Sequence, residues 1–165
     1  MPDTPSPIPS DGPSDARRAD PPPLHAIHET VLYAVDLAAA ERFYRDVLGL
    51  EQIIEGSELM IGFRVTPKPG QVLLIFNPEV SSVPGRPVPS HGCRGDGHLA
   101  LRISPEDEPT WITHLESHGV EIERVTEWDS NRGRSIYVRD PAGNSVELIN
   151  ADIWARIGAG RLGSV

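Results

Sequence analysis

Cysteine, long apolar runs and positive charge are all scarce in this chain, and each shortage excludes a class of protein. Cys93 is the only cysteine among 165 residues, so no intrachain disulfide can form and a reducing, cytoplasmic location is expected. No apolar run approaches the roughly 20 residues that a membrane-spanning helix requires. The formal net charge of −9 argues against nucleic acid or an anionic membrane as a partner.

The two ends of the chain differ from the part between them. Eight of the 17 prolines fall in Met1–Pro23, and a segment of this composition cannot bury a core. Residues 1–26 are therefore expected to form a disordered tail, with a partner-binding polyproline II segment as the alternative. No apolar segment follows Arg17 and Arg18, so no signal peptide is predicted. At the other end, residues 151–165 are expected to form a tail with a short helix carrying Ile153, Trp154 and Ile157.

The central part of the chain repeats one order of elements. Each half contains a strand, a helix that ends at a glycine, and further strands. The first half has a strand at 29–35, a helix capped by Asp36 and a stop at Gly49; the second has a strand at 97–103, a helix at 105–118 and a stop at Gly119. The two glycines are 119 − 49 = 70 residues apart. We therefore predict one domain, residues 27–150, built from modules 27–77 and 98–150 with a loop at 78–97 between them.

A carboxylate lies in the most informative strand, near the C-terminus. The turn Asp140–Asn144 (sequence DPAGN) separates two apolar runs, and the second run places Glu147 among Val146, Leu148 and Ile149. An unpaired carboxylate in a half-buried strand is costly, so a metal ion is one candidate partner. The alternative is that Glu147 faces solvent on an amphipathic strand.

The strand that opens the second module also begins with a residue that binds metals. Leu99, Leu101 and Ile103 alternate with His98, Ala100 and Arg102. The apolar set must meet a helix. His98 and Arg102 are therefore expected on the opposite face.

Several short motifs together resemble one known family. They are Val35–Leu37, Phe43–Leu50, Gly97–His98, Tyr137–Asn144 and Val146–Leu148. With these motifs the chain resembles the vicinal oxygen chelate superfamily of glyoxalases, bleomycin and fosfomycin resistance proteins and extradiol dioxygenases, from about Ile27 to Ile149. The resemblance implies an α+β fold in which two βαβββ modules form a curled mixed sheet, an open barrel, around a metal cup.

The resemblance also implies a set of metal ligands from the first and last strands of the modules. The last-strand position is Glu147 and the first-strand position of the second module is His98. In the first module, the ligand position seven residues before Asp36 is Glu29, and His98 likewise lies seven residues before Pro105. His28 is the rival, because histidine is usual at this position in the family. The counterpart of Glu147 in the first module is apolar, at Leu73 or Leu74.

Two carboxylates and one histidine form a hard ligand set with open coordination positions, which favours one divalent ion, Mn²⁺, Fe²⁺ or Zn²⁺. Extradiol dioxygenases use two histidines and one carboxylate, so that activity does not transfer directly. An alternative zinc cluster of His91, Cys93 and His98 matches no common zinc motif.

Further site residues follow from strand alternation. If the turn centres on Ala142, Tyr137 lies across from Glu147 and can donate to an oxygen bound in the cup, which makes Tyr137 and Glu147 the candidate catalytic residues. Arg102 shares the His98 face and is a candidate for binding an anionic substrate group; a salt bridge at the strand end is the alternative. Tyr33 shares the Glu29 face and is a candidate substrate-contacting wall. The Pro- and Gly-rich loop 77–97 is a candidate rim.

The resemblance implies a metal-dependent enzyme that acts on a small molecule with two neighbouring oxygens, with glyoxalase-like or dioxygenase-like chemistry. The alternative is a metal-free protein that sequesters a drug in the same cup, as bleomycin resistance proteins do. Each module alone is close to the size at which a core becomes marginal. A symmetric homodimer is expected from the resemblance.

Overall fold

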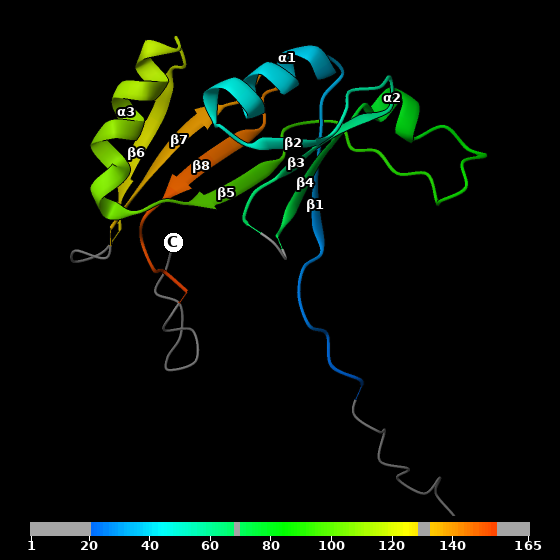
Figure 1. Ribbon diagram of the computed structural model, residues 1–165, viewed down its shortest axis with the longest axis horizontal. Coiled ribbons are helices and arrows are strands. Elements are labelled where there is room, and N and C mark those ends of the chain that lie inside the picture. Colours follow the sequence, from blue (N-terminus) through cyan, green and yellow to red (C-terminus); the bar gives the residue numbers. More distant parts are fainter. Residues whose placement is uncertain (1–20, 68–69, 129–132, 155–165) are drawn as a thin grey trace, which may run out of the picture.

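Two four-stranded sheets of the same topology form the protein (Figure 1). The computed structural model describes residues 21–67, 70–128 and 133–154. Module one contains β1 (Glu29–Tyr33), α1 (Leu37–Arg42) extended by a π-helical turn (Phe43–Val47), β2 (Glu51–Ile54), β3 (Met60–Arg64) and β4 (Val72–Phe76). The connection carries the short helix α2 (Pro78–Ser81). Module two contains β5 (His98–Arg102), a 3₁₀ turn (Pro105–Asp107), α3 (Glu108–Ser117), β6 (Ile122–Glu127), β7 (Arg134–Arg139) and β8 (Ser145–Ile149).

The predicted repeat and the predicted α+β class are confirmed. The strand orders are β1-β4-β3-β2 and β5-β8-β7-β6, so each module pairs its first and last strands. That pairing is parallel in both modules, and the other strand pairs are antiparallel. Among the described residues the two sheets share no strand pairing, so the curled arrangement stays open. No helix in the same residues is long and apolar enough to cross a membrane.

The first helix starts and stops where the sequence indicated. The Asp36 carboxylate caps α1 by accepting a hydrogen bond from the Ala39 N–H at 2.8 Å. Its last turn is wider than an α-helix, because the Leu48 N–H donates to the carbonyl of Phe43, five residues back. The chain then leaves the helix at Gly49, where φ is +68°.

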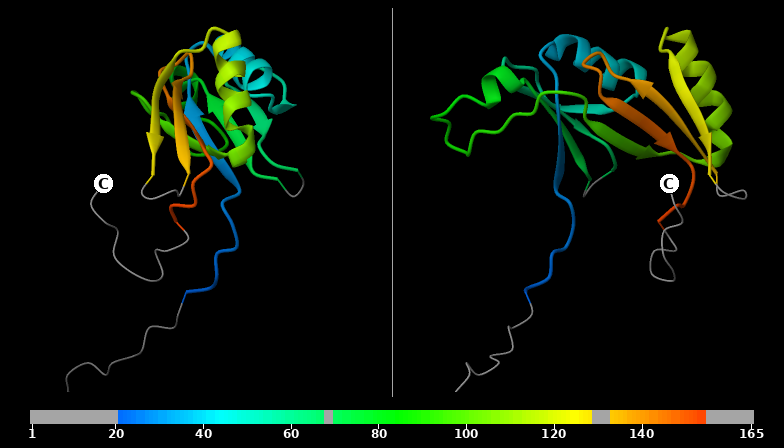
Figure 2. Two further views of the ribbon diagram at one scale, coloured as in Figure 1. Left: turned by 90° about the vertical axis from the view of Figure 1, so that its left-hand side faces the viewer. Right: turned by 180° about the vertical axis from the view of Figure 1, so that it is seen from behind.

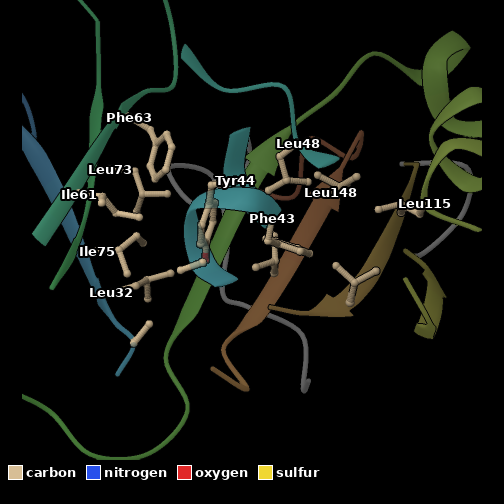
Figure 3. Packing of buried hydrophobic residues seen from close by; sticks show 14 of the residues in the cluster. Leu32, Phe43, Tyr44, Leu48, Ile61, Phe63, Leu73, Ile75, Leu115 and Leu148 are labelled. Atoms are coloured by element: carbon tan, nitrogen blue, oxygen red, sulfur yellow. The ribbon is translucent and has the colours of Figure 1, made fainter. Parts of the chain in front are cut away.

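Helices α1 and α3 lie on one face of the sheets (Figure 2), and the buried apolar residues lie between these helices and the strands. Figure 3 shows Phe43 and Tyr44 between the module-one side chains and Leu148 of module two. The core residues of the strands alternate; they include Leu32, Ile61, Phe63, Leu73 and Ile75 in module one and Ile136, Val138, Val146 and Leu148 in module two, with Leu115 of α3 packed among them. The side chains between them therefore line the opposite, open face of each sheet.

A buried hydrogen-bond network joins the modules at the DPAGN turn. The Tyr44 hydroxyl donates to Asp140 Oδ2 at 2.8 Å, and Asn144 Nδ2 donates to the Tyr33 carbonyl at 3.1 Å. The Asn144 Oδ1 accepts from the Gly97 N–H at 2.8 Å. A Cβ at Gly97 would lie 2.6 Å from the Leu32 side chain and 2.9 Å from Asn144 Oδ1, so a larger residue would force this crossing to shift. The turn predicted from sequence is thus also the joint between the two modules.

Alkaline pH is expected to weaken this joint. Burial, and then the adjacent Asp140 carboxylate, raise the pKa of Tyr44 well above its usual range. A group with a raised folded-state pKa contributes stability that is present below its unfolded pKa, about 10, and lost as the pH rises above it.

Replacing Tyr44 with phenylalanine should therefore make stability less dependent on pH above pH 10. Urea unfolding at several pH values measures this, since one proton retained only by the folded state changes the free energy of unfolding by about 1.4 kcal/mol per pH unit. If the free energy of unfolding falls with pH equally steeply in the wild type and in Tyr44→Phe above pH 10, Tyr44 is not the group responsible.

The two ends of the described chain differ in how they contact the domain. Residues 21–30 are exposed, whereas Ala151 is buried and its carbonyl accepts a hydrogen bond from Arg102 Nη1 at 3.0 Å. Residues 151–154 form no helix, and Trp154 is 65% exposed. The remainder of the predicted C-terminal helix lies outside the described residues, as do residues 1–20 of the predicted N-terminal tail.

Deleting residues 1–23 is expected to shift the melting temperature by no more than about two degrees, because this segment offers no apolar surface to the core. Truncation after Asn150 should lower it further, because the buried Ala151 contact is lost. Differential scanning calorimetry of both truncated proteins checks this order. A larger loss from the N-terminal deletion would mean that the tail is structural.

Candidate metal centre

The Glu147 carboxylate lies on the open face of module two. Glu147 is in the middle of β8, between Ala100 of β5 and Tyr137 of β7. The cross-strand position of Tyr137 is confirmed. Glu147 is only 6% exposed, although its neighbours in sequence, Val146 and Leu148, face the core on the other side of the sheet. The solvent-facing alternative for this residue is therefore wrong.

Each oxygen of this carboxylate has a different set of partners. Oε2 lies 3.2 Å from His98 Nε2. Oε1 accepts a hydrogen bond from the Ser135 hydroxyl at 2.5 Å and another from the Tyr137 hydroxyl at 3.1 Å. Within the described residues, Glu147 forms no ion pair with lysine or arginine. In this part of the chain, two hydroxyls and an imidazole are thus the only groups that compensate a nearly buried carboxylate.

Tyr137 acts as a hydrogen-bond donor in this arrangement. Burial, and then the charge of Glu147 and the hydrogen bond to it, raise the pKa of Tyr137. The phenol therefore keeps its proton at neutral pH and donates it in the hydrogen bond to Glu147 Oε1.

Glu29 occupies the module-one position that corresponds to His98. Glu29 pairs with Val72 at the start of β1, as His98 pairs with Ser145 at the start of β5. Leu32, three residues later, is in the core, so strand alternation puts Glu29 on the open face. By the same register, the counterpart of Glu147 is Leu74, which pairs with Val31 of the neighbouring strand β1.

One chain does not gather all three proposed ligands. The part of the chain that the structure describes contains no group of three or more His, Cys, Asp or Glu residues that could hold a metal ion. His98 and Glu147 are in contact, whereas Glu29 is exposed in the other module. The alternative cluster of His91, Cys93 and His98 does not form in these residues either.

The two candidate substrate-binding residues each have a contact on the open face. Arg102 donates one of its five N–H groups to the Ala151 carbonyl. The Tyr33 hydroxyl is 2.9 Å from His91 Nδ1, and burial, followed by the nearby Cys93, raises the pKa of Tyr33. The 77–97 loop therefore rests on Tyr33 through His91. A cavity of about 520 Å³ lies beside this contact, lined by residues that include Tyr33, Cys93 and Arg94.

The donors at Glu147 suit a divalent cation. Carboxylate oxygen and imidazole nitrogen are ligands of Mn²⁺, Fe²⁺ and Zn²⁺. The hydroxyls on Oε1 supply the outer hydrogen bonds that usually orient a metal-binding carboxylate. They leave Oε2, the oxygen beside His98, as the free ligand atom. Ser135 and its donor Trp128 were not predicted from the sequence, although Ser135 alternates with Tyr137 and so shares its face.

Comparison with known proteins identifies relatives along most of the chain. The family model for the Glyoxalase/Bleomycin resistance protein/Dioxygenase superfamily matches residues 26–148. Metallothiol transferase FosB of Staphylococcus epidermidis is 28% identical over 128 residues, which are 77% of this chain and 85% of that protein.

Solved structures agree with the sequence match. The crystal structure of lactoylglutathione lyase from Agrobacterium tumefaciens is 40% identical, with a TM-score of 0.73 over 81% of this chain and 99% of that chain. The fosfomycin resistance protein FosX of Listeria monocytogenes, solved with Mn(II), is 20% identical, with a TM-score of 0.60 over 79% of this chain and 93% of its own. At that identity the likeness concerns the fold alone.

Proposed function

Because the chain belongs to the Glyoxalase/Bleomycin resistance protein/Dioxygenase superfamily, we propose that it is a divalent-metal-dependent enzyme acting on a small molecule with two neighbouring oxygens. The observation that carries the proposal is the contact between His98 and the nearly buried Glu147, whose Oε1 is already satisfied by hydroxyl donors. Without a cation, the carboxylate would have little charge compensation.

His98 and Glu147 of one chain and Glu29 of a second copy hold the ion in this proposal. The support for two chains is that Glu29 is exposed and lies apart from the other two ligands. Two carboxylates and one imidazole leave coordination positions for substrate oxygens. Manganese, iron and zinc all fit this donor set.

The surrounding residues supply the other parts of the reaction. The bound ion would act as a Lewis acid that polarises the substrate oxygens and stabilises negative charge on them. Tyr137 can turn its hydroxyl from Glu147 Oε1 to a substrate oxygen, and Glu147 then doubles as a proton acceptor at the Oε1 that this turn leaves free. Arg102 has further N–H donors for an anionic substrate group, and Tyr33 forms part of the substrate wall below the loop.

The shared ligand set requires a homodimer. Light scattering at micromolar concentration should give about 36 kDa, twice the 18.0 kDa of one chain. The expected symmetric pair brings module one of one chain against module two of the other. A mass near 18.0 kDa would exclude the two-chain site.

The experiment that tests the function begins with metal-free protein. Each divalent ion is added and the thermal shift recorded, because a ligand that binds only the folded state raises the melting temperature. The metal-loaded protein is then screened for turnover, starting with lactoylglutathione and other thiol adducts. These compounds are chosen because one relative is named a metallothiol transferase and another a lactoylglutathione lyase. Turnover that needs the metal supports the enzyme. Drug binding by metal-free protein with no turnover would support the sequestering alternative.

A further inference from the structure

Ser135 lies at the start of β7 with no exposed surface, and its single hydroxyl bridges two side chains. Its oxygen accepts a hydrogen bond from Trp128 Nε1 at 2.7 Å. The same hydroxyl donates to Glu147 Oε1 at 2.5 Å. Trp128 follows directly after β6, and its backbone N–H closes the β6–β7 hairpin on the Gly133 carbonyl at 3.0 Å.

The chemistry of the indole fixes the direction of this chain of bonds. An indole N–H can only donate, so Ser135 must accept from Trp128. The one hydroxyl proton of Ser135 is then free to be donated, and Glu147 Oε1 accepts it at 2.5 Å. With the Tyr137 hydroxyl also on Oε1, this oxygen has two donors, and Oε2 remains beside His98.

We propose that Trp128 and Ser135 form a one-way hydrogen-bond relay that orients the Glu147 carboxylate so that Oε2 alone binds the metal. The inference rests on the proposed metal site. It assigns Ser135 and Trp128 as positioning residues, which act through Glu147 and do not touch the ion or the substrate. Without the relay, Oε1 keeps only the longer hydrogen bond from Tyr137, at 3.1 Å, and the carboxylate rotates more freely about its terminal torsion, which is broad and roughly two-fold.

Titration of metal-free protein with Mn²⁺, followed by the electron paramagnetic resonance signal of free Mn²⁺, measures the effect without any substrate. Ser135→Ala should raise the Kd roughly 10- to 100-fold, the usual consequence of losing an outer partner of a metal ligand. Trp128→Phe should raise it less, because Ser135 still has a proton to donate. In the Ser135→Ala background, Trp128→Phe should have no further effect, because the relay is already broken.

Matched controls separate the relay from a general loss of packing. Ser81 is also fully buried, and within the described residues its hydroxyl has no hydrogen-bond partner. Ser81→Ala and Trp111→Phe should therefore leave the Kd unchanged. If Ser135→Ala does not fold, as judged by circular dichroism, the Kd for Mn²⁺ of Trp128→Phe is compared with that of Trp111→Phe. A higher Kd in Trp128→Phe then supports the relay.

The inference is overturned if Ser135→Ala binds Mn²⁺ within about twofold of the wild type, or if Trp128→Phe weakens binding equally with and without Ser135. It is also overturned if Trp128→Phe and Trp111→Phe bind alike. Wild-type protein that binds no divalent ion would refute the proposed function itself, and that outcome is distinct from these.

Discussion

His98→Ala and Glu147→Ala are each expected to lose nearly all bound metal under conditions in which the wild-type protein holds one divalent ion per chain. The two side chains meet at 3.2 Å on the open face of module two, and each supplies one of only three proposed ligands. Losing one of three ligands also removes the geometry that the other two require. Elemental analysis after dialysis against metal-free buffer measures the loss.

Two matched variants serve as controls for this result. His25 and Glu121 are both exposed, so His25→Ala and Glu121→Ala should keep the wild-type metal content. Equal metal content in His98→Ala, Glu147→Ala and the wild type would refute the site.

Asp140→Ala is expected to destabilise the protein by about 3 kcal/mol or more, because it leaves several buried donors without an acceptor. The Asp140 carboxylate is 3% exposed. It accepts hydrogen bonds from the Tyr44 hydroxyl, the Ala142 N–H and both the N–H and the Nδ2 of Asn144, at 2.8–2.9 Å. For a chain of this length the melting temperature should fall by about 6–12 °C.

Asp152 is exposed and provides the control, since Asp152→Ala should stay within about 0.5 kcal/mol of the wild type. Asp140→Asn keeps the size of the side chain and should lose less stability than Asp140→Ala. Urea denaturation of the three variants gives these free energies. If Asp140→Ala is as stable as Asp152→Ala, the DPAGN turn does not join the modules.

The sequence was sufficient for the parts of the fold that depend on local periodicity. The strand beginning at His98 alternates apolar and polar side chains, and the helix after Asp36 has both its cap and its stop in the sequence. Repetition of this order 70 residues later predicted two modules of equal topology. The contact of Tyr44 with Asp140 could not be predicted, because it joins residues 96 apart and depends on how the modules pack.

Some residues of the candidate site could likewise be predicted from local sequence, and others could not. Counting residues on either side of the DPAGN turn placed Tyr137 opposite Glu147, as the structure confirms. Trp128 was missed because a tryptophan at a strand end has no periodic signal, and only the β6–β7 pairing brings it to Ser135. The choice between Glu29 and His28 stays a prediction: the register places Glu29 opposite the core face, and the proposed ion would be shared between chains.

Pulsed electron paramagnetic resonance of the Mn²⁺-loaded protein measures whether one histidine and two carboxylates hold the metal. Nitrogen hyperfine coupling counts the imidazoles bound to the ion. We expect coupling to a single histidine, which disappears in His98→Ala and persists in His28→Ala, while Glu29→Ala loses most of its bound Mn²⁺. Coupling to two imidazoles, with one of them lost in His28→Ala, would show instead that His28 replaces Glu29 as the third ligand.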